Sequence, residues 1–113
     1  MQVYKTPLRE YKFLLEDFLN LKDHSILTNR NLEIDDLLMI LEEGAKMCEE
    51  TLLPLNITGD SEGCTFRNGT VITPKGFKEA YKTFSENGWQ GVKVKEKYGG
   101  QDLPYIMLSL IHI

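Results

Sequence analysis

One pentapeptide of the chain matches the pattern of a serine nucleophile. Gly59-Asp60-Ser61-Glu62-Gly63 reads as G-x-S-x-G, which in serine hydrolases places the serine on a strained turn between a strand and a helix. Here the surrounding sequence predicts a long helix and a polar loop before the motif and a hairpin after it. His112 is the one histidine that follows it as a potential base. The sequence therefore favours a flexible surface loop over a nucleophile elbow.

Metal and modification patterns are equally incomplete. Asp60 and Glu62 could supply oxygen ligands, but the alternating series of an EF-hand loop is absent. His24, Cys48 and Cys64 lack the spacing of a shared metal site, and Cys48 fits a small core residue. The sequons Asn56-Ile57-Thr58 and Asn68-Gly69-Thr70 carry little meaning without a secretory signal. No metal ligand is predicted.

Three lysines at alternate positions are the main candidates for phosphate contacts. Lys93, Lys95 and Lys97 lie between Trp89 and Tyr98. The 113-residue chain is acidic, however, with 13 Lys+Arg against 17 Asp+Glu and a net charge of −4, so a solvated segment is favoured and nucleic acid is not expected as a partner. The glycines of the segment 98–104 match neither a Walker loop nor a dinucleotide fingerprint. These motifs therefore predict neither a catalytic residue nor a cofactor-binding residue.

The first half of the chain predicts two helices. One begins at Thr6-Pro7, with Thr6 as N-cap, and carries apolar residues at helical spacing: Leu8, Tyr11, Leu15 and Phe18. The polar run 20–31 is interpreted as a connection. The second helix has Asn31 as its cap and should end or kink near Leu53 because Pro54 follows. Its apolar stripe consists of Ile34, Leu37, Leu38, Leu41, Ala45, Cys48 and Leu52, while Glu42 and Glu43 lie on the polar side.

The second half of the chain is interrupted more often by turn-forming residues. Residues 56–63 are turn-forming, and Asn68-Gly69 predicts a two-residue hairpin turn between 65–67 and 70–72. A third helix should begin at Thr73-Pro74 and stop near Gly88. It presents one apolar face: Phe77, Ala80, Tyr81 and Phe84. Residues 89–104 are loop-like. The predicted fold class is mainly all-α with a small β-hairpin near 64–72.

Several segments, taken in order, resemble the N-terminal part of an acyl-CoA dehydrogenase, in the branch with a short helical extension before the common helical domain. They cover about residues 3–105: Tyr4-Lys5-Thr6-Pro7-Leu8-Arg9, Ile40-Leu41-Glu42-Glu43-Gly44-Ala45-Lys46, Leu53-Pro54-Leu55-Asn56, Gly59-Asp60 with Gly63-Cys64, Val71-Ile72-Thr73-Pro74-Lys75-Gly76-Phe77, Gly88-Trp89, and Tyr98-Gly99-Gly100-Gln101-Asp102-Leu103-Pro104. Each segment is weak alone, and the ordered series is specific.

The resemblance implies an FAD-dependent flavoenzyme that carries out α,β-dehydrogenation of an acyl-CoA. FAD would take a hydride from Cβ while a glutamate removes the Cα proton, and electrons would pass to electron-transfer flavoprotein. The acyl chain could be a medium or long fatty one or a sulfur-containing one such as methylmercaptopropionyl, and the parent would be a homo-oligomer. In the family, the base and the flavin-contacting segments lie beyond the position of Pro104. No residue here, Glu42 and Glu43 included, takes these roles, so we expect this fragment alone to be inactive.

The end of the chain reads differently from the rest. Leu108 to Ile113 back-translates to a transposon end used as a sequencing adaptor, and we expect this tail to be non-native. The expected division is therefore 1–31 as the helical extension, 32–107 as the start of the N-terminal helical domain, and 108–113 as the tail. The residues at the start lack the apolar core of a signal peptide, so we expect a cytoplasmic protein without a membrane span.

Two other classes stay open at this point. The chain could be a non-catalytic helical interaction module, whose apolar stripes pair with a partner chain. It could also derive from a DNA-damage-associated relative of the dehydrogenases, although that class calls for a basic surface and this chain is acidic.

Overall fold

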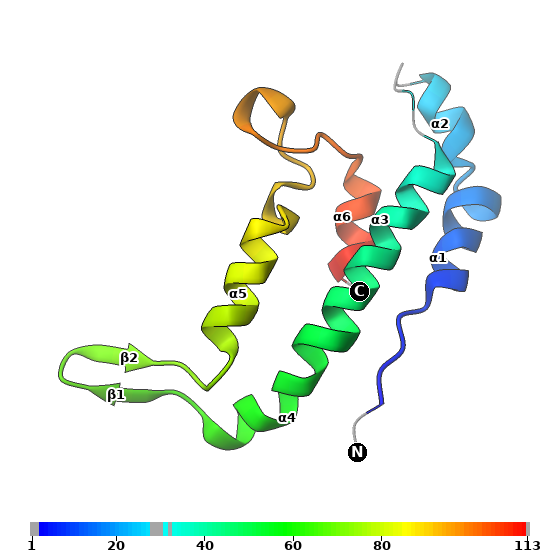
Figure 1. Ribbon diagram of the computed structural model, residues 1–113. Coiled ribbons are helices and arrows are strands. Elements are labelled where there is room, and N and C mark those ends of the chain that lie inside the picture. The colour runs from blue at the N-terminus through cyan, green and yellow to red at the C-terminus, as the bar shows by residue number, and fades with distance from the viewer. Residues whose placement is uncertain (1–2, 28–30, 32, 113) are drawn as a thin grey trace.

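The computed structural model describes residues 3–27, 31 and 33–112, and the side chains of 25–27 and 110–112 lie outside the description. The chain is mainly helical with one two-stranded sheet, which confirms the predicted class (Figure 1). Its elements follow in the order α1 (Leu8–Phe13), the π-helix η1 (Leu14–Phe18), α2 (Leu21–Leu27), α3 (Ile34–Lys46), the π-helix η2 (Met47–Leu52), α4 (Leu53–Glu62), β1 (Thr65–Arg67), β2 (Thr70–Ile72), α5 (Phe77–Glu86), the 3₁₀ turns η3 (Trp89–Gly91) and η4 (Glu96–Tyr98), and α6 (Tyr105–His112).

The central feature is a long helix in which α3, η2 and α4 follow one another without a break from Ile34 to Glu62 (Figure 1). The predicted stripe is confirmed at its centre, where Leu37 and Leu41 are each 2% exposed. Of the two outcomes predicted at Pro54, an end of the helix near Leu53 is wrong. Pro54 lies in the first turn of α4, directly after the π-helix η2, and the helix continues through it although its backbone N–H is missing. The π-helical turn before it also widens the backbone where the proline ring would otherwise meet a carbonyl.

The segment interpreted as turn-forming, 56–63, is helical up to Glu62, and its hydroxyl side chains bond back to the preceding turn. The hydroxyl of Thr58 donates to the carbonyls of Pro54 and Leu55 at 3.3 Å each, and that of Ser61 donates to the carbonyl of Ile57 at 2.9 Å. Such bonds from Ser and Thr to the preceding turn satisfy the hydroxyls inside a helix. The turn-forming residues of this segment therefore fit inside a helix.

Three expectations about residues 6–31 are also wrong. The hydroxyl of Thr6 caps nothing, because Pro7 holds the cap position of α1 and makes no side-chain cap bond. Part of the run interpreted as a connection forms α2, which follows Asn20, a residue with a φ of 45°. Leu21, 2% exposed, anchors α2 in the core. The cap position of α3 belongs to Glu33, while Asn31 is exposed.

The hairpin is confirmed. Thr65 pairs with Ile72, Phe66 with Val71, and Arg67 with Thr70 in antiparallel register. Asn68 and Gly69 have φ values of 50° and 78°, the two positive angles that a type I′ turn requires.

The predicted start of α5 is three residues early. Gly76, with a φ of 87°, interrupts the backbone before Phe77, and a Cβ at this glycine would lie 2.7 Å from Cδ2 of Leu55. On the predicted apolar face Ala80 is buried, but Tyr81 is 71% exposed. The stop near Gly88 is confirmed, because Asn87 ends α5 and Gly88 is left-handed.

The core lies at one end of the molecule, where α1 and α6 both pack on α3. Its fully buried side chains belong to segments far apart in the sequence: Leu15, Val92 and Met107. The molecule is a slab of 55 × 37 × 16 Å with a radius of gyration of 17.1 Å. A compact domain of this length would have a radius of gyration of about 13 Å. The prediction of a non-native tail at 108–113 stays a prediction, and Ile113 lies outside the described residues.

Candidate functional site: the groove between α3 and α5

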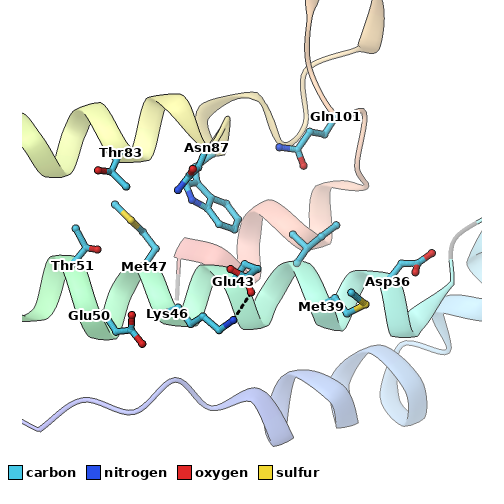
Figure 2. Close-up of a pocket in the computed structure, with 12 residues that line it drawn as sticks. Asp36, Met39, Glu43, Lys46, Met47, Glu50, Thr51, Thr83, Asn87 and Gln101 are labelled. Atoms are coloured by element: carbon cyan, nitrogen blue, oxygen red, sulfur yellow. Dashed lines mark hydrogen bonds and ion pairs between the residues drawn. The ribbon is translucent and has the colours of Figure 1, made fainter.

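A groove of about 730 Å³ separates the α3–η2 helix from α5. Figure 2 shows Thr83 and Asn87 on the α5 side, opposite Met47 and Thr51 on the long helix. The groove is lined by Asp36, Met39, Ile40, Glu43, Lys46, Met47, Glu50, Thr51, Thr83, Asn87, Trp89 and Gln101. Because these residues come from three separate stretches of sequence, only the packing of α3, α5 and the following loop assembles them.

Trp89 and Met47 form the buried floor of the groove, with 9% and 7% exposure. The indole sits over Gly44 of α3, where a Cβ would lie 3.5 Å from its Cη2 atom. The indole N–H of Trp89 is buried and finds no acceptor among the described residues. Such an unpaired buried donor lowers the free energy of unfolding by about 1–3 kcal/mol.

The rim of the groove is acidic. Asp36, Glu43 and Glu50 oppose a single cation, Lys46, whose ammonium bonds to the carboxylate of Glu43. That hydrogen bond, reinforced by the charge of Glu43, raises the pKa of Lys46. The hydroxyl of Thr83 is committed to the carbonyl of Glu79 at 3.1 Å. An apolar floor beneath this polar rim suits holding an apolar group.

FAD, which the family resemblance implies, does not fit this groove. A dinucleotide diphosphate is held by backbone N–H groups at a helix start or by cations. The lining residues carry three carboxylates, and their single lysine is already paired. This groove therefore does not form a flavin site by itself.

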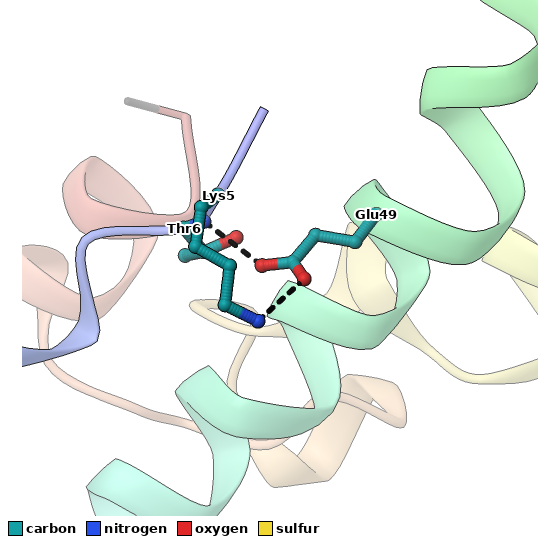
Figure 3. A network of polar contacts seen from close by, with 3 residues as sticks. All are labelled: Lys5, Thr6 and Glu49. Carbon is teal, nitrogen blue, oxygen red and sulfur yellow. Dashed lines mark hydrogen bonds and ion pairs between the residues drawn. The ribbon is translucent and has the colours of Figure 1, made fainter. Parts of the chain in front are cut away.

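A second polar contact ties the N-terminal strap, residues 3–7, to the long helix. The carboxylate of Glu49 accepts two bonds of 2.8 Å each, from the ammonium of Lys5 and from the backbone N–H of Thr6 (Figure 3). These bonds, with that of Lys5 the larger cause, lower the pKa of Glu49. Sequence reasoning could not supply the partners of Glu49, because Lys5 and Thr6 lie more than forty positions away.

The sequence-predicted candidates are dispersed rather than brought together. Ser61 lies inside α4 and not on a strand-to-helix turn, so the G-x-S-x-G match lacks its structural context. The side chain of His112 lies outside the described residues. Glu42 and Glu43 are exposed on the polar side of α3, as predicted.

The candidate metal and phosphate residues also have structural positions of their own. The carboxylate of Glu62 accepts the backbone N–H of Lys75 at 3.0 Å. In the part of the chain that the structure describes, no three His, Cys, Asp or Glu side chains gather to hold a metal ion. Lys93 lies over the ring of Tyr105 at 4.3 Å, and Lys97 over that of Tyr98 at 4.8 Å.

The cysteines are both free. Cys48 is half-buried, and burial raises the pKa of its thiol, whereas Cys64 is exposed. Among the described residues, no helix has the length and apolarity needed to cross a membrane.

Sequence reasoning missed the groove itself. The signals that could have pointed to it are Gly44 in the middle of a strong helix and the single tryptophan just after α5. A glycine in a helix interior costs about 1 kcal/mol relative to alanine, although a Cβ at Gly44 would meet the Trp89 ring only at an ordinary contact distance.

Comparisons with known proteins give two relatives. The chain is 34% identical over 105 residues to the 3-methylmercaptopropionyl-CoA dehydrogenase of Ruegeria pomeroyi, a match that covers 92% of this chain and 18% of that protein. It is also 34% identical over 92 residues to the butyryl-CoA dehydrogenase of Syntrophomonas wolfei, covering 75% of this chain and 15% of that protein. The chain thus spans less than a fifth of the length of these curated relatives. No family model matches it.

Proposed function

The chain is homologous to a segment of the acyl-CoA dehydrogenases, and we propose that it is the N-terminal helical part of a longer enzyme of this kind. The parent would carry out α,β-dehydrogenation of an acyl-CoA thioester. In this proposal residues 1–31 are the helical extension, 32–107 begin the N-terminal helical domain, and 108–113 are a non-native tail.

The match to the Ruegeria pomeroyi protein is the observation that carries the proposal. It extends over 92% of the chain, so it includes far more than one motif. The shape of the molecule adds support, because a slab only 16 Å thick leaves apolar side chains on its outside that a larger structure would cover.

The groove supports an assignment of what this chain contributes. Its acidic rim does not fit FAD, so the proposal assigns the flavin and the catalytic base to the remainder of the full-length protein. The fragment alone is then inactive. Its role is to form a rigid helical layer against which the remainder packs. Electron-transfer flavoprotein as acceptor, a homo-oligomeric parent and a cytoplasmic location belong to the same proposal.

The substrate class follows from the two relatives. The names of these relatives specify butyryl-CoA and 3-methylmercaptopropionyl-CoA, which are both short, unbranched thioesters. We propose a short, straight-chain acyl-CoA as the substrate of the parent.

The test uses the full-length protein encoded by the extended reading frame. We expect it to purify yellow and to lose its flavin absorbance under anaerobic conditions when butyryl-CoA or 3-methylmercaptopropionyl-CoA is added. Pivaloyl-CoA is the matched control, because it has no hydrogen on Cα and cannot be dehydrogenated. A folded, colourless full-length protein would contradict the proposal and favour the helical interaction module.

A further inference from the structure

The hairpin formed by β1, β2 and their turn, 65–72, is an arm that projects from the end of the slab remote from α1 and α2 (Figure 1). All of its strand residues are exposed. Two short strands without cover are marginally stable in water. The arm therefore lacks, within this chain, the apolar contacts that normally hold a hairpin together.

The two faces of the arm differ in chemistry. Phe66 and Val71 are cross-strand partners, so they lie on one face, and they are 71% and 59% exposed. The other face carries the two remaining pairs: Thr65 with Ile72, and Arg67 with Thr70. Arg67, on this second face, is the one charged residue of the strands. The face of Phe66 and Val71 is thus wholly apolar.

The base of the arm is fixed in place. The backbone N–H of Lys75, after the arm, donates to the carboxylate of Glu62, before it, at 3.0 Å. Close by, the ring of Phe77 packs on Gly59 so tightly that a Cβ there would lie 2.4 Å from the ring. The apolar face is therefore presented at a defined position on the slab.

We propose that the Phe66–Val71 face docks on an apolar segment of the same full-length polypeptide outside residues 1–113. This inference rests on the proposed function, since it requires that the chain belong to a longer protein. The relatives have more than four fifths of their length outside the match, so the remainder is long enough to supply the cover.

A second copy of the protein is a poorer occupant of this face. A stable interface between two molecules buries about 800 Å² on each partner, which two strands of three residues do not provide. A segment on the same polypeptide needs much less area, because tethering gives it a millimolar effective concentration. The small size of the face thus favours an intramolecular partner.

The first test is photo-cross-linking in the full-length protein, with p-benzoylphenylalanine in place of Phe66. We expect mass spectrometry to find a cross-link to a peptide from beyond residue 113 of the same molecule. The same probe in place of Thr70, on the opposite face, is the matched control and should not give that cross-link. A covalent dimer, or no cross-link from position 66, would overturn the proposal.

The second test is hydrogen exchange of the arm amides in the full-length protein. We expect slow exchange in the wild type, about tenfold faster exchange in Phe66→Asp, and little change in Thr70→Asp. Fast exchange in the wild type, or protection that disappears on dilution, would overturn the docking. Flavin bleaching in the same wild-type preparation is a separate readout, so failure of the proposed function and failure of the docking are told apart.

Discussion

The two ends of the slab differ in how much of their apolar surface is covered. The first end is built from α1, α3 and α6, and the second from α4, the hairpin and the start of α5. At the first end Leu15 and Met107 are fully buried. At the second end Ile57 is 55% exposed and Phe66 is 71% exposed. The first end packs its core side chains within the chain, although Phe13 and Phe18 on its surface are 55% and 71% exposed. The second end has no such fully buried large side chain and presents apolar side chains that nothing in the described residues covers. Urea unfolding of residues 1–113, followed by the fluorescence of the single tryptophan, Trp89, can measure this difference.

The largest effect is expected for a truncation in the packed end. Leu15→Ala removes a side chain that is 0% exposed, and the cavity it leaves should lower the free energy of unfolding by about 2–5 kcal/mol. Ile57→Ala is the matched control in the open end and should change it by no more than about 0.5 kcal/mol. Equal losses at the two positions would show that the open end is packed in solution.

Two neighbouring glycines in the loop before α6 separate close packing from backbone strain. A Cβ at Gly100 would lie 1.9 Å from the carbonyl oxygen of Val94, so Gly100→Ala must displace backbone and should cost about 2–4 kcal/mol. A Cβ at Gly99 would meet nothing within 4 Å, but its φ is 84°, so Gly99→Ala should cost only about 1–2 kcal/mol. If Gly99→Ala proved the more damaging of the two, this description of the loop would be wrong.

A smaller change in the free energy of unfolding is expected where α4 meets α5, and its sign should depend on whether Phe77 is present. Gly59→Ala brings a Cβ within 2.4 Å of the Phe77 ring, and this clash should outweigh the helix propensity of alanine by about 1 kcal/mol. In a Phe77→Ala background the clash is gone, and the same change should stabilise the helix by about 1 kcal/mol. The double-mutant cycle measures the coupling, and additive values would refute the contact.

The smallest effect concerns the bond between the N-terminal strap and the long helix. The pKa of Glu49 is lowered from its ordinary value of 4.5, so its bonds to Lys5 and Thr6 contribute stability above that value. This contribution should be lost as the pH falls through the lowered pKa of the folded state. Unfolding measured from neutral to acidic pH should show the loss, and Glu49→Gln should show a smaller slope in that range. An identical pH dependence in both proteins would exclude a role for this carboxylate.

Local sequence patterns predicted the elements whose signals did not compete. The stripe of α3 places Leu37 and Leu41 in the core because helical spacing puts them on one face. The hairpin turn follows from Asn68-Gly69, a pair that tolerates positive φ at both positions. The patterns failed at Pro54 and at the segment 56–63, where breaking and turn residues fit inside a helix: a π-helical turn precedes the proline, and hydroxyls bond back to the preceding turn.

By itself, the sequence determined the helical class, the hairpin and its register, the acidic charge and the resemblance to acyl-CoA dehydrogenases, because each of these depends on residue types at short spacing or on their order along the chain. The tertiary structure alone decided how Trp89 comes to lie over Gly44 and which partners Glu49 finds. These contacts join residues more than forty positions apart. No local periodicity encodes such contacts, because they exist only once the helices have packed together.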